Sequence, residues 1–230
     1  RFTVGYLEVA RKNTKTTLAA GVALYLAFIE GEPGAEVYSA AVKKDQAKIC
    51  HKDATEMVKR SKFLKKEKIK VFRNNLSHEP SGSKFEPLAS DSDSLDGLNI
   101  YGVIADELHA WKNDGLWGVL KTATGSRRQP LMLAITTAGT NQQGVCYRQR
   151  EYIGRILKGI IQDDSFGGMI YTIDTKKDWP DLDQDDDWQD ENTLITANPN
   201  YGISVDVDGL KNQLNKAKQS ARKQNAFKTK

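Results

Sequence analysis

Eight residues near the start of the chain decide the fold: Val9-Ala10-Arg11-Lys12-Asn13-Thr14-Lys15-Thr16. They follow a strand-like apolar run and precede a helix-like apolar run over residues 17–29. A Lys-Thr pair at such a junction suits a nucleoside triphosphate. The first helical amides face the phosphates, the ammonium reaches the outer ones, and the hydroxyl ligates Mg²⁺. The stretch therefore predicts an ATP-binding loop made of Arg11, Lys12, Asn13, Thr14, Lys15, Thr16 and Thr17.

The loop departs from the usual pattern of Gly, four residues, Gly, Lys and then Ser or Thr. Val9 and Thr14 stand at the two glycine positions. If the second position needs a positive φ, a β-branched residue there costs on the order of 1–3 kcal/mol. Thr14 therefore either adopts an ordinary conformation or weakens nucleotide binding. A basic surface turn is the alternative interpretation of this stretch.

A second motif lies about ninety residues further on, where the apolar run Ile100–Ala105 ends in Asp106 and Glu107. Two neighbouring buried charges are costly unless they have a task. In a phosphoryl-transfer site, Asp106 would bind Mg²⁺ together with Thr16, and Glu107 would orient and deprotonate the attacking water. The alternative is a strand that runs into a surface turn with ordinary acids. The two motifs together predict an ATPase.

Strand-like and helix-like segments alternate, which predicts an α/β fold with a mostly parallel sheet flanked by helices. The expected strands are Thr3–Val9, Glu36–Ala41, Ile69–Arg73, Ile100–Ala105, Leu131–Thr136 and Gly168–Asp174. The expected helices are Lys15–Glu30, Lys43–Lys62, Gly115–Thr122, Val145–Gly159 and Val207–Lys223. Residues 78–97 and 176–191 are expected to be loops. The order of segments fits a RecA-like P-loop NTPase with an additional strand and a catalytic glutamate.

The apolar strand that begins at Leu131 ends in Thr136 and Thr137. Carboxyl ends of strands converge on the ligand crevice in open α/β sheets. Either hydroxyl could therefore contact the γ-phosphate or the attacking water and report hydrolysis to the rest of the domain. A capped strand end is the alternative for each threonine taken singly.

Composition sets the broad class. The 230 residues are 39% hydrophobic with a net charge of +4, and no apolar run approaches the roughly 20 residues of a membrane span. Two Cys and three His, unclustered, argue against a zinc site or a disulfide framework. We expect residues 1–176 to form the ATPase core and residues 177–230 an acidic loop and a basic helical segment. That segment could contact nucleic acid, although a solvated helix is the alternative.

Taken together, these motifs resemble one family, the large terminase subunit of tailed bacteriophages, a motor that packages DNA into procapsids. The matching stretches are Glu8–Ala20, Ser90–Leu98, Val103–Trp111, Thr136–Gly139 and Ala197–Gly202. The resemblance implies that hydrolysis of Mg-ATP is coupled to translocation of double-stranded DNA. It assigns nucleotide and magnesium binding to Lys15 and Thr16, metal binding to Asp106, catalysis to Glu107, and coupling to Thr136 and Thr137.

The resemblance also implies partners and limits. Arg11 stands where some relatives place a cis-acting arginine finger, whereas others supply the finger from a neighbouring subunit; a γ-phosphate or structural contact is the alternative. The family acts as a homo-oligomeric ring with a portal protein and a small terminase subunit, in the host cell cytoplasm and without a membrane. Its nuclease domain is expected beyond Lys230 and its adenine-contacting segment before Arg1, so no nuclease activity is expected of these residues.

Two other functions stay open from the sequence. One is a different nucleic-acid-stimulated, helicase-like P-loop ATPase. The other is a DNA-binding assembly module whose ATP site has decayed, which the threonine at position 14 would fit. Arg127 and Arg128, in a turn before Leu131, are candidates for a DNA or inter-subunit contact, with a plain exposed turn as the alternative.

Overall fold

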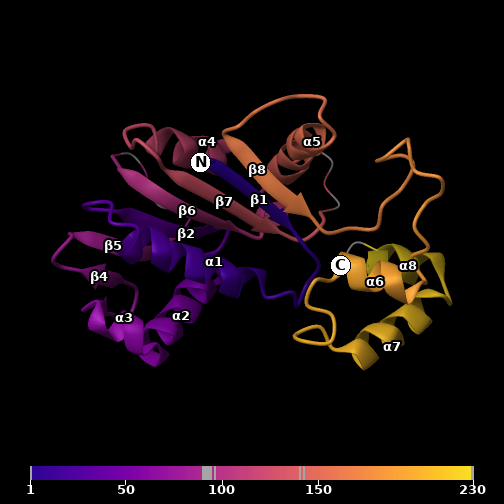
Figure 1. Ribbon diagram of the computed structural model, residues 1–230, viewed down its shortest axis with the longest axis horizontal. Helices are drawn as coiled ribbons and strands as arrows, with labels where there is room; N and C mark the ends of the chain where they lie inside the picture. Colours follow the sequence, from indigo (N-terminus) through magenta and orange to yellow (C-terminus); the bar gives the residue numbers. More distant parts are fainter. Residues whose placement is uncertain (1, 90–94, 96, 140, 142, 229–230) are drawn as a thin grey trace.

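A computed structural model describes residues 2–89, 95, 97–139, 141 and 143–228 (Figure 1). The strands are β1 (Val4–Glu8), β2 (Glu36–Ala41), β3 (Lys70–Val71), β4 (Leu76–His78), β5 (Ser83–Ala89), β6 (Ile100–Asp106), β7 (Leu131–Thr136) and β8 (Phe166–Ile170). The helices are α1 (Lys15–Leu24), η1 (Tyr25–Ile29), α2 (Lys44–Arg60), α3 (Lys62–Lys66), η2 (Leu108–Ala110), α4 (Gly115–Ala123), α5 (Val145–Leu157), α6 (Glu191–Ala197), α7 (Val207–Ala217) and α8 (Ala221–Lys228).

The strands form one sheet in the order β3-β4-β5-β2-β6-β7-β1-β8. All pairs from β5 to β8 are parallel, and only β3 and β4 add an antiparallel edge. The strand β7 lies between β1 and β6. The first precedes the predicted ATP-binding loop at residues 11–17, called the phosphate loop below, and the second ends in Asp106. The predicted α/β fold with a mostly parallel sheet and an additional strand is therefore confirmed.

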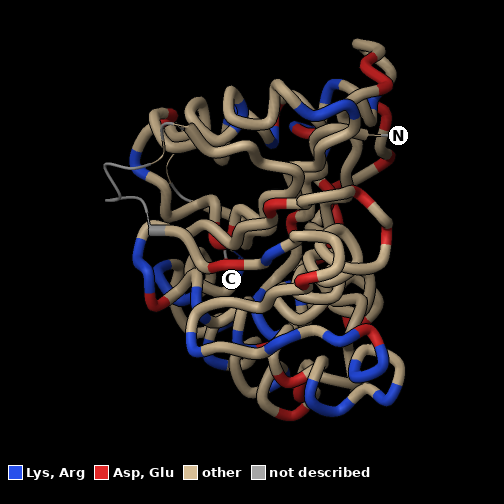
Figure 2. Tube along the Cα trace, turned by 90° about the vertical axis from the view of Figure 1, so that its left-hand side faces the viewer, with Lys and Arg blue, Asp and Glu red and all other residues tan. Residues whose placement is uncertain are grey.

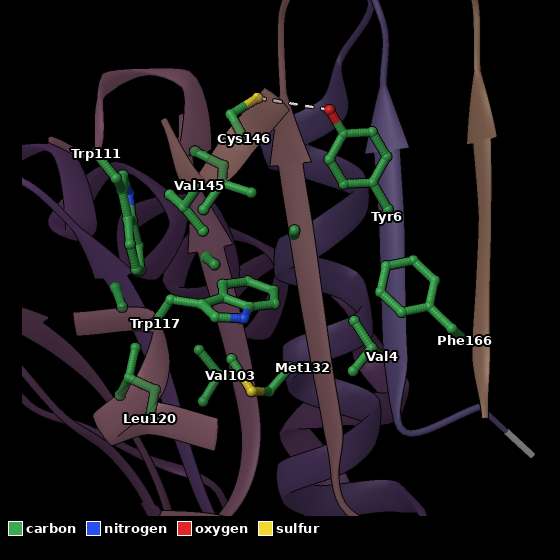
Figure 3. Packing of buried hydrophobic residues seen from close by; sticks show 14 of the residues in the cluster. Val4, Tyr6, Val103, Trp111, Trp117, Leu120, Met132, Val145, Cys146 and Phe166 are labelled. Atoms are coloured by element: carbon green, nitrogen blue, oxygen red, sulfur yellow. Dashed lines mark hydrogen bonds between the residues drawn. The ribbon is translucent and has the colours of Figure 1, made fainter. Parts of the chain in front are cut away.

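Helices cover both faces of the sheet and enclose two hydrophobic cores (Figure 1). On one face α4 and α5 pack against the central strands, where Trp117 meets Val103 and Met132 in the close view of Figure 3. On the other face the small residues of α1 pack against α2 and the sheet. Helices α6 to α8 lie beside the carboxyl ends of β1 and β8 (Figure 1). Burial on both faces explains why the central strands read as apolar runs.

Several expected elements differ in detail. The expected loop over residues 78–97 contains β5, and the expected strand at Ile69–Arg73 shrinks to the two residues of β3. Within β5, Pro87 pairs in register with Ser39 of β2. The helix expected over Lys15–Glu30 turns into a π-helix at Tyr25, and the one over Val207–Lys223 divides into α7 and α8.

A further helix, α6, begins at the end of the acidic stretch at residues 176–191. The sequence predicted a loop at that stretch and did not predict the helix. Most of Ser90–Leu98, one of the stretches that carry the family resemblance, lies outside the described residues. Within the described ranges, no helix is long and apolar enough to cross a membrane. Many Lys and Arg residues lie in the lower half of the trace in Figure 2.

Candidate nucleotide-binding site

The register of the parallel strands brings the predicted site residues to one edge of the sheet. Glu8 at the end of β1 pairs with Thr136 at the end of β7, and Asp106 at the end of β6 pairs with Ile135. The phosphate loop follows β1 and leads into α1, whose first residue is Lys15. The loop and the three strand ends therefore lie at one edge of the sheet, the edge at which ligands bind in open α/β sheets.

The phosphate loop has the backbone shape of an anion-binding turn. Lys12 and Thr14 both adopt the left-handed conformation, with φ of 69° and 56°. Turns that include left-handed residues can direct successive N–H groups into one concavity, and the N-terminus of α1 adds its own free amides and positive dipole end. Arg11 and Lys12 are exposed beside this concavity, whereas Lys15 is buried.

Thr14 does not adopt an ordinary conformation, so the structure excludes the first of the two alternatives from the sequence. Its φ of 56° and ψ of 23° lie in the left-handed region, which favours glycine. Two hydrogen bonds offset the strain: the Thr14 hydroxyl donates to the carbonyl of Asn13 at 2.8 Å and accepts from Nδ2 of Asn200 at 2.5 Å. Glycine could make neither bond.

The turn between α6 and α7 holds the phosphate loop at further points. Asn13 Nδ2 donates to Asn198 Oδ1 at 2.9 Å, and the Asn200 amide donates to Asn13 Oδ1 at 3.1 Å. Ser204 Oγ donates to the carbonyl of Lys12 at 2.5 Å. The loop is therefore fixed to a segment almost 190 residues further along the chain, a connection that the sequence pattern did not indicate.

The two acidic residues meet the Lys-Thr pair. Thr16 Oγ1 lies 3.4 Å from Asp106 Oδ2, and Lys15 Nζ lies 3.5 Å from Glu107 Oε1. Asp106 is 4% exposed, and its burial, with the neighbouring carboxylate of Glu107, raises its pKa from 3.8 to about 6. Such a carboxylate lacks sufficient positive charge around it, so the position favours a cation.

Glu107 combines an uncommon backbone conformation with a partly buried carboxylate. Its backbone is left-handed with φ of 50°, which is uncommon for a residue other than glycine. Burial pushes the pKa of Glu107 up, but the neighbouring His109 and Lys15 more than offset this, so the pKa is lowered and the group is a carboxylate at neutral pH. Its Oε2 atom is buried and accepts no hydrogen bond from any described residue.

Thr136 and Thr137 are buried, and both contact the short helix η2 that follows Glu107. Thr136 Oγ1 accepts a hydrogen bond from the His109 amide at 3.0 Å. Nδ1 of His109 lies 3.2 Å from Thr136 Oγ1, 3.3 Å from Thr137 Oγ1 and 3.1 Å from Glu107 Oε2. The sequence assigned no role to His109, because a lone histidine carries no spacing signal.

Other predicted residues are placed less centrally. The Thr17 hydroxyl donates to Asp53 of α2 at 2.8 Å, so this side chain points toward α2. Arg11 and Lys12 line a cavity of about 280 Å³ between the phosphate loop, the segment after β8 and helices α6 to α8. The residues that line this cavity do not include Lys15, Asp106 or Glu107, so Arg11 faces a hollow distinct from the acidic pair.

Arg127 is not free for a DNA or inter-subunit contact. Its guanidinium pairs with Glu32 at 3.0 Å and donates to the carbonyls of Gly34 at 2.7 Å and Asn99 at 3.2 Å. The side chain therefore ties the turn before β7 to the loop after η1. Arg128 next to it is exposed.

A buried polar group beneath the phosphate loop was missed from the sequence. Glu8, 2% exposed, accepts from the Tyr6 hydroxyl at 2.7 Å and pairs with Arg150 Nε of α5 at 3.1 Å. Cys146 Sγ lies 3.5 Å from the same hydroxyl, as Figure 3 shows, and 3.7 Å from Thr136 Oγ1. Burial and the charge of Glu8 raise the pKa of Tyr6, so it stays a hydroxyl donor.

The fold and the matches to known proteins define a P-loop NTPase with an additional strand between the two motif-bearing strands. The chain belongs to the family described as the terminase large subunit, ATPase domain, which residues 1–155 match. The chain is 42% identical over 135 residues to Protein YmfN of Escherichia coli (strain K12). It is 29% identical over 139 residues to the terminase large subunit of Enterobacteria phage HK97. Each match covers 59% of this chain and 28% of the relative.

Solved structures show the same fold. The crystal structure of the HK97 bacteriophage large terminase superposes with a TM-score of 0.82 at 23% identity, over 99% of this chain and 46% of that one. The large terminase ATPase domain of Thermus phage P74-26 gives a TM-score of 0.58 at 20% identity, over 78% and 79% of the two chains. The large terminase of another thermophilic bacteriophage, in complex with ADP, gives a TM-score of 0.52 at 10% identity, over 79% and 42%.

Proposed function

We propose that this chain is the ATP-hydrolysing motor domain of a viral DNA-packaging terminase, which couples hydrolysis of Mg-ATP to translocation of double-stranded DNA into a procapsid. One observation carries the proposal. Lys15 and Thr16, at the start of α1, meet Glu107 and Asp106, at the end of β6, at 3.5 and 3.4 Å. The cation, hydroxyl and carboxylates that phosphoryl transfer needs therefore lie together at one edge of the sheet.

The roles follow from the chemistry of each group. Lys15 neutralises the outer phosphates at the helix N-terminus, where the amides of the phosphate loop add further positive character. The buried Glu107 Oε2, which no described residue serves with a hydrogen bond, suits acceptance of a proton from the attacking water. Thr136 and Thr137 respond to the outer phosphate. Arg11 supplies positive charge to the phosphate that is transferred, either in its own chain or in the site of a neighbouring copy.

The residues fit Mg²⁺ as the metal. Magnesium prefers oxygen ligands and is usually bound through one or two protein groups together with substrate phosphates. Thr16 and Asp106 offer a hydroxyl and a carboxylate, and no cluster of three or more His, Cys, Asp or Glu that could hold a metal occurs within the described ranges. The cation would be held by Thr16 and Asp106, would supply the positive charge that Asp106 lacks and would neutralise charge on the outer phosphates.

The family also supports nucleotide binding, the division of the chain and the partners in this proposal. The large terminase solved in complex with ADP supports nucleotide binding by the same fold here. Residues 1–176 form the ATPase core in this proposal, and residues 177–230 form a helical subdomain that leads toward a nuclease domain. The partners are double-stranded DNA, further copies of the chain in a ring, a portal protein and a small terminase subunit, all in the host cytoplasm.

Phosphate release in steady state tests the proposal, with ATP binding measured separately by fluorescence of a labelled analogue. Wild type should bind and hydrolyse Mg-ATP, and Glu107→Gln should bind it but turn over at least about 10²-fold more slowly, as loss of a general base typically produces. Wild-type turnover equal to that of Glu107→Gln, with DNA present or absent, would favour the decayed DNA-binding module instead. Stimulation by single strands but not by duplex would favour a helicase-like enzyme.

A further inference from the structure

His109 lies between the acidic pair and the two threonines, and the proposed function gives it no role. Its Nδ1 atom is within 3.3 Å of three oxygens from three residues, namely Glu107, Thr136 and Thr137. The first belongs to the end of β6 and the other two to the end of β7. One ring nitrogen thus connects the base to the strand end that senses the phosphate.

The backbone holds the ring in this place. The His109 amide donates to Thr136 Oγ1 at 3.0 Å, so main chain and side chain are anchored on the same threonine. Gly139 closes the other side: a Cβ atom there would lie 3.0 Å from Cβ of His109. Because Thr136 and Thr137 are buried, the partly exposed ring contacts them on its inner side.

The chemistry of the nitrogen makes the contact exclusive. A neutral imidazole carries one N–H, and in the tautomer with the proton on Nδ1 this group makes one good hydrogen bond at a time. The hydrogen-bond geometry in the structure is met toward the threonine hydroxyls, while Glu107 Oε2 at 3.1 Å receives no hydrogen bond. A small rotation of the ring would transfer the N–H from the threonines to the carboxylate.

We propose that His109 is a positioning residue, which sets the place of the Glu107 carboxylate according to the position of the Thr136–Thr137 strand end. The proposal rests on the proposed function, since it presumes that Glu107 is the base. When the end of β7 moves and Thr137 turns toward a phosphate or water, both threonines release Nδ1, and the ring then fixes the carboxylate for proton transfer. When Thr137 holds Nδ1, the carboxylate keeps a free oxygen and a looser position.

Three variants at one position test the role by turnover. Because all three contacts go through Nδ1, asparagine can replace them with its δ-position amide, whereas glutamine places its amide one bond further out. His109→Ala should lower kcat for ATP hydrolysis roughly 10- to 100-fold with KM changed less than about threefold, as small misplacements of catalytic groups do. His109→Asn should restore most of kcat, and His109→Gln should not.

His78 on β4 provides the matched control, because it is a partly buried histidine whose Nδ1 lies 2.8 Å from Ser81 Oγ, away from the proposed site. His78→Ala should leave kcat unchanged. Two results overturn the proposal: equal loss of kcat with asparagine and glutamine, or a loss that appears in KM instead of kcat. Thermal unfolding of each variant separates misfolding from misplacement, and His109→Asn, with a similar shape, provides the folded comparison if His109→Ala unfolds.

A second measurement does not depend on turnover. The chain has only three histidines, so the imidazole nitrogens can be followed by ¹⁵N NMR on histidine-labelled protein. Thr137→Val and Glu107→Gln should each shift the His109 ring nitrogens and leave those of His51 and His78 in place. If neither substitution moves the His109 signals, the positioning role is refuted even in an active enzyme. If they move but wild type hydrolyses no ATP, the proposed function fails while the contact stands.

Discussion

Replacing Asp106 with asparagine should stabilise the domain measured without nucleotide, although it removes a proposed metal ligand. Asp106 is 4% exposed, and burial beside Glu107 raises its pKa from 3.8 to about 6. A shift of about two units corresponds to roughly 3 kcal/mol at 1.36 kcal/mol per unit, which the folded protein loses by keeping this group ionised at pH 7. Asparagine keeps the shape and an acceptor for the Glu107 amide, so Asp106→Asn should gain about 2 kcal/mol.

The gain must depend on pH in a defined direction. The folded state binds the Asp106 proton more tightly than the unfolded state, so the contribution of Asp106 to wild-type stability falls as pH rises from about 4 to about 6 and is then level. The advantage of Asp106→Asn should be full above pH 6 and vanish near pH 4. For a chain of this length 2 kcal/mol corresponds to about 4–8 °C in Tm. Urea and thermal unfolding between pH 4.5 and 8 measure it.

An exposed aspartate serves as the control for Asp106, and added Mg-ATP should alter the comparison. Asp45→Asn changes a carboxylate whose side chain is 93% exposed and should alter stability by less than about 0.5 kcal/mol at any pH. Adding Mg-ATP should raise the Tm of wild type more than that of Asp106→Asn, because only wild type retains the carboxylate ligand for the cation. The reasoning is refuted if Asp106→Asn is less stable than wild type at pH 7.5, or if its advantage does not change with pH.

Three further outcomes are expected. Lys15→Ala should lower turnover roughly 10²-fold or more, because it removes the cation that faces developing charge; an isothermal titration that shows unaltered ATP affinity and rate would contradict its role. Thr14→Gly should retain stability within about 1 kcal/mol, since relief of left-handed strain offsets the two lost hydrogen bonds, and should make Asn200→Ala neutral in a double-mutant cycle of unfolding; additive effects of the pair would contradict the contact. The purified chain should leave supercoiled plasmid intact with Mg²⁺ or Mn²⁺, and robust cleavage would refute the proposed assignment of its domains.

The central strands were predictable because strands that are buried on both faces have continuous apolar sequences. The segments Glu36–Ala41 and Leu131–Thr136 were expected with the bounds that the structure shows. The convergence of Lys15 with Asp106 also followed, because carboxyl ends of parallel strands share one edge. Local apolar pattern and two short motifs were therefore enough to place the crevice.

What the sequence could not show depends on contacts between distant segments. The left-handed Thr14 is held by Asn200, 186 residues away, and no local rule connects the two. The strand β5 carries Ser83, Pro87 and a neighbouring polar run, so its composition indicated a loop, although pairing with β2 decides otherwise. The His109 contacts arise from the sheet register, which single-sequence patterns do not specify.

A crystal structure with Mg²⁺ and a non-hydrolysable ATP analogue tests the central claim most directly. We expect Lys15 Nζ to leave Glu107, from which it is 3.5 Å away, and to contact the β- and γ-phosphates. A cation should lie between Thr16 Oγ1 and the Asp106 carboxylate, with the attacking water near Glu107. Phosphates bound in the cavity beside Arg11 and Lys12, with Lys15 still on Glu107 and no cation at Asp106, would contradict the account.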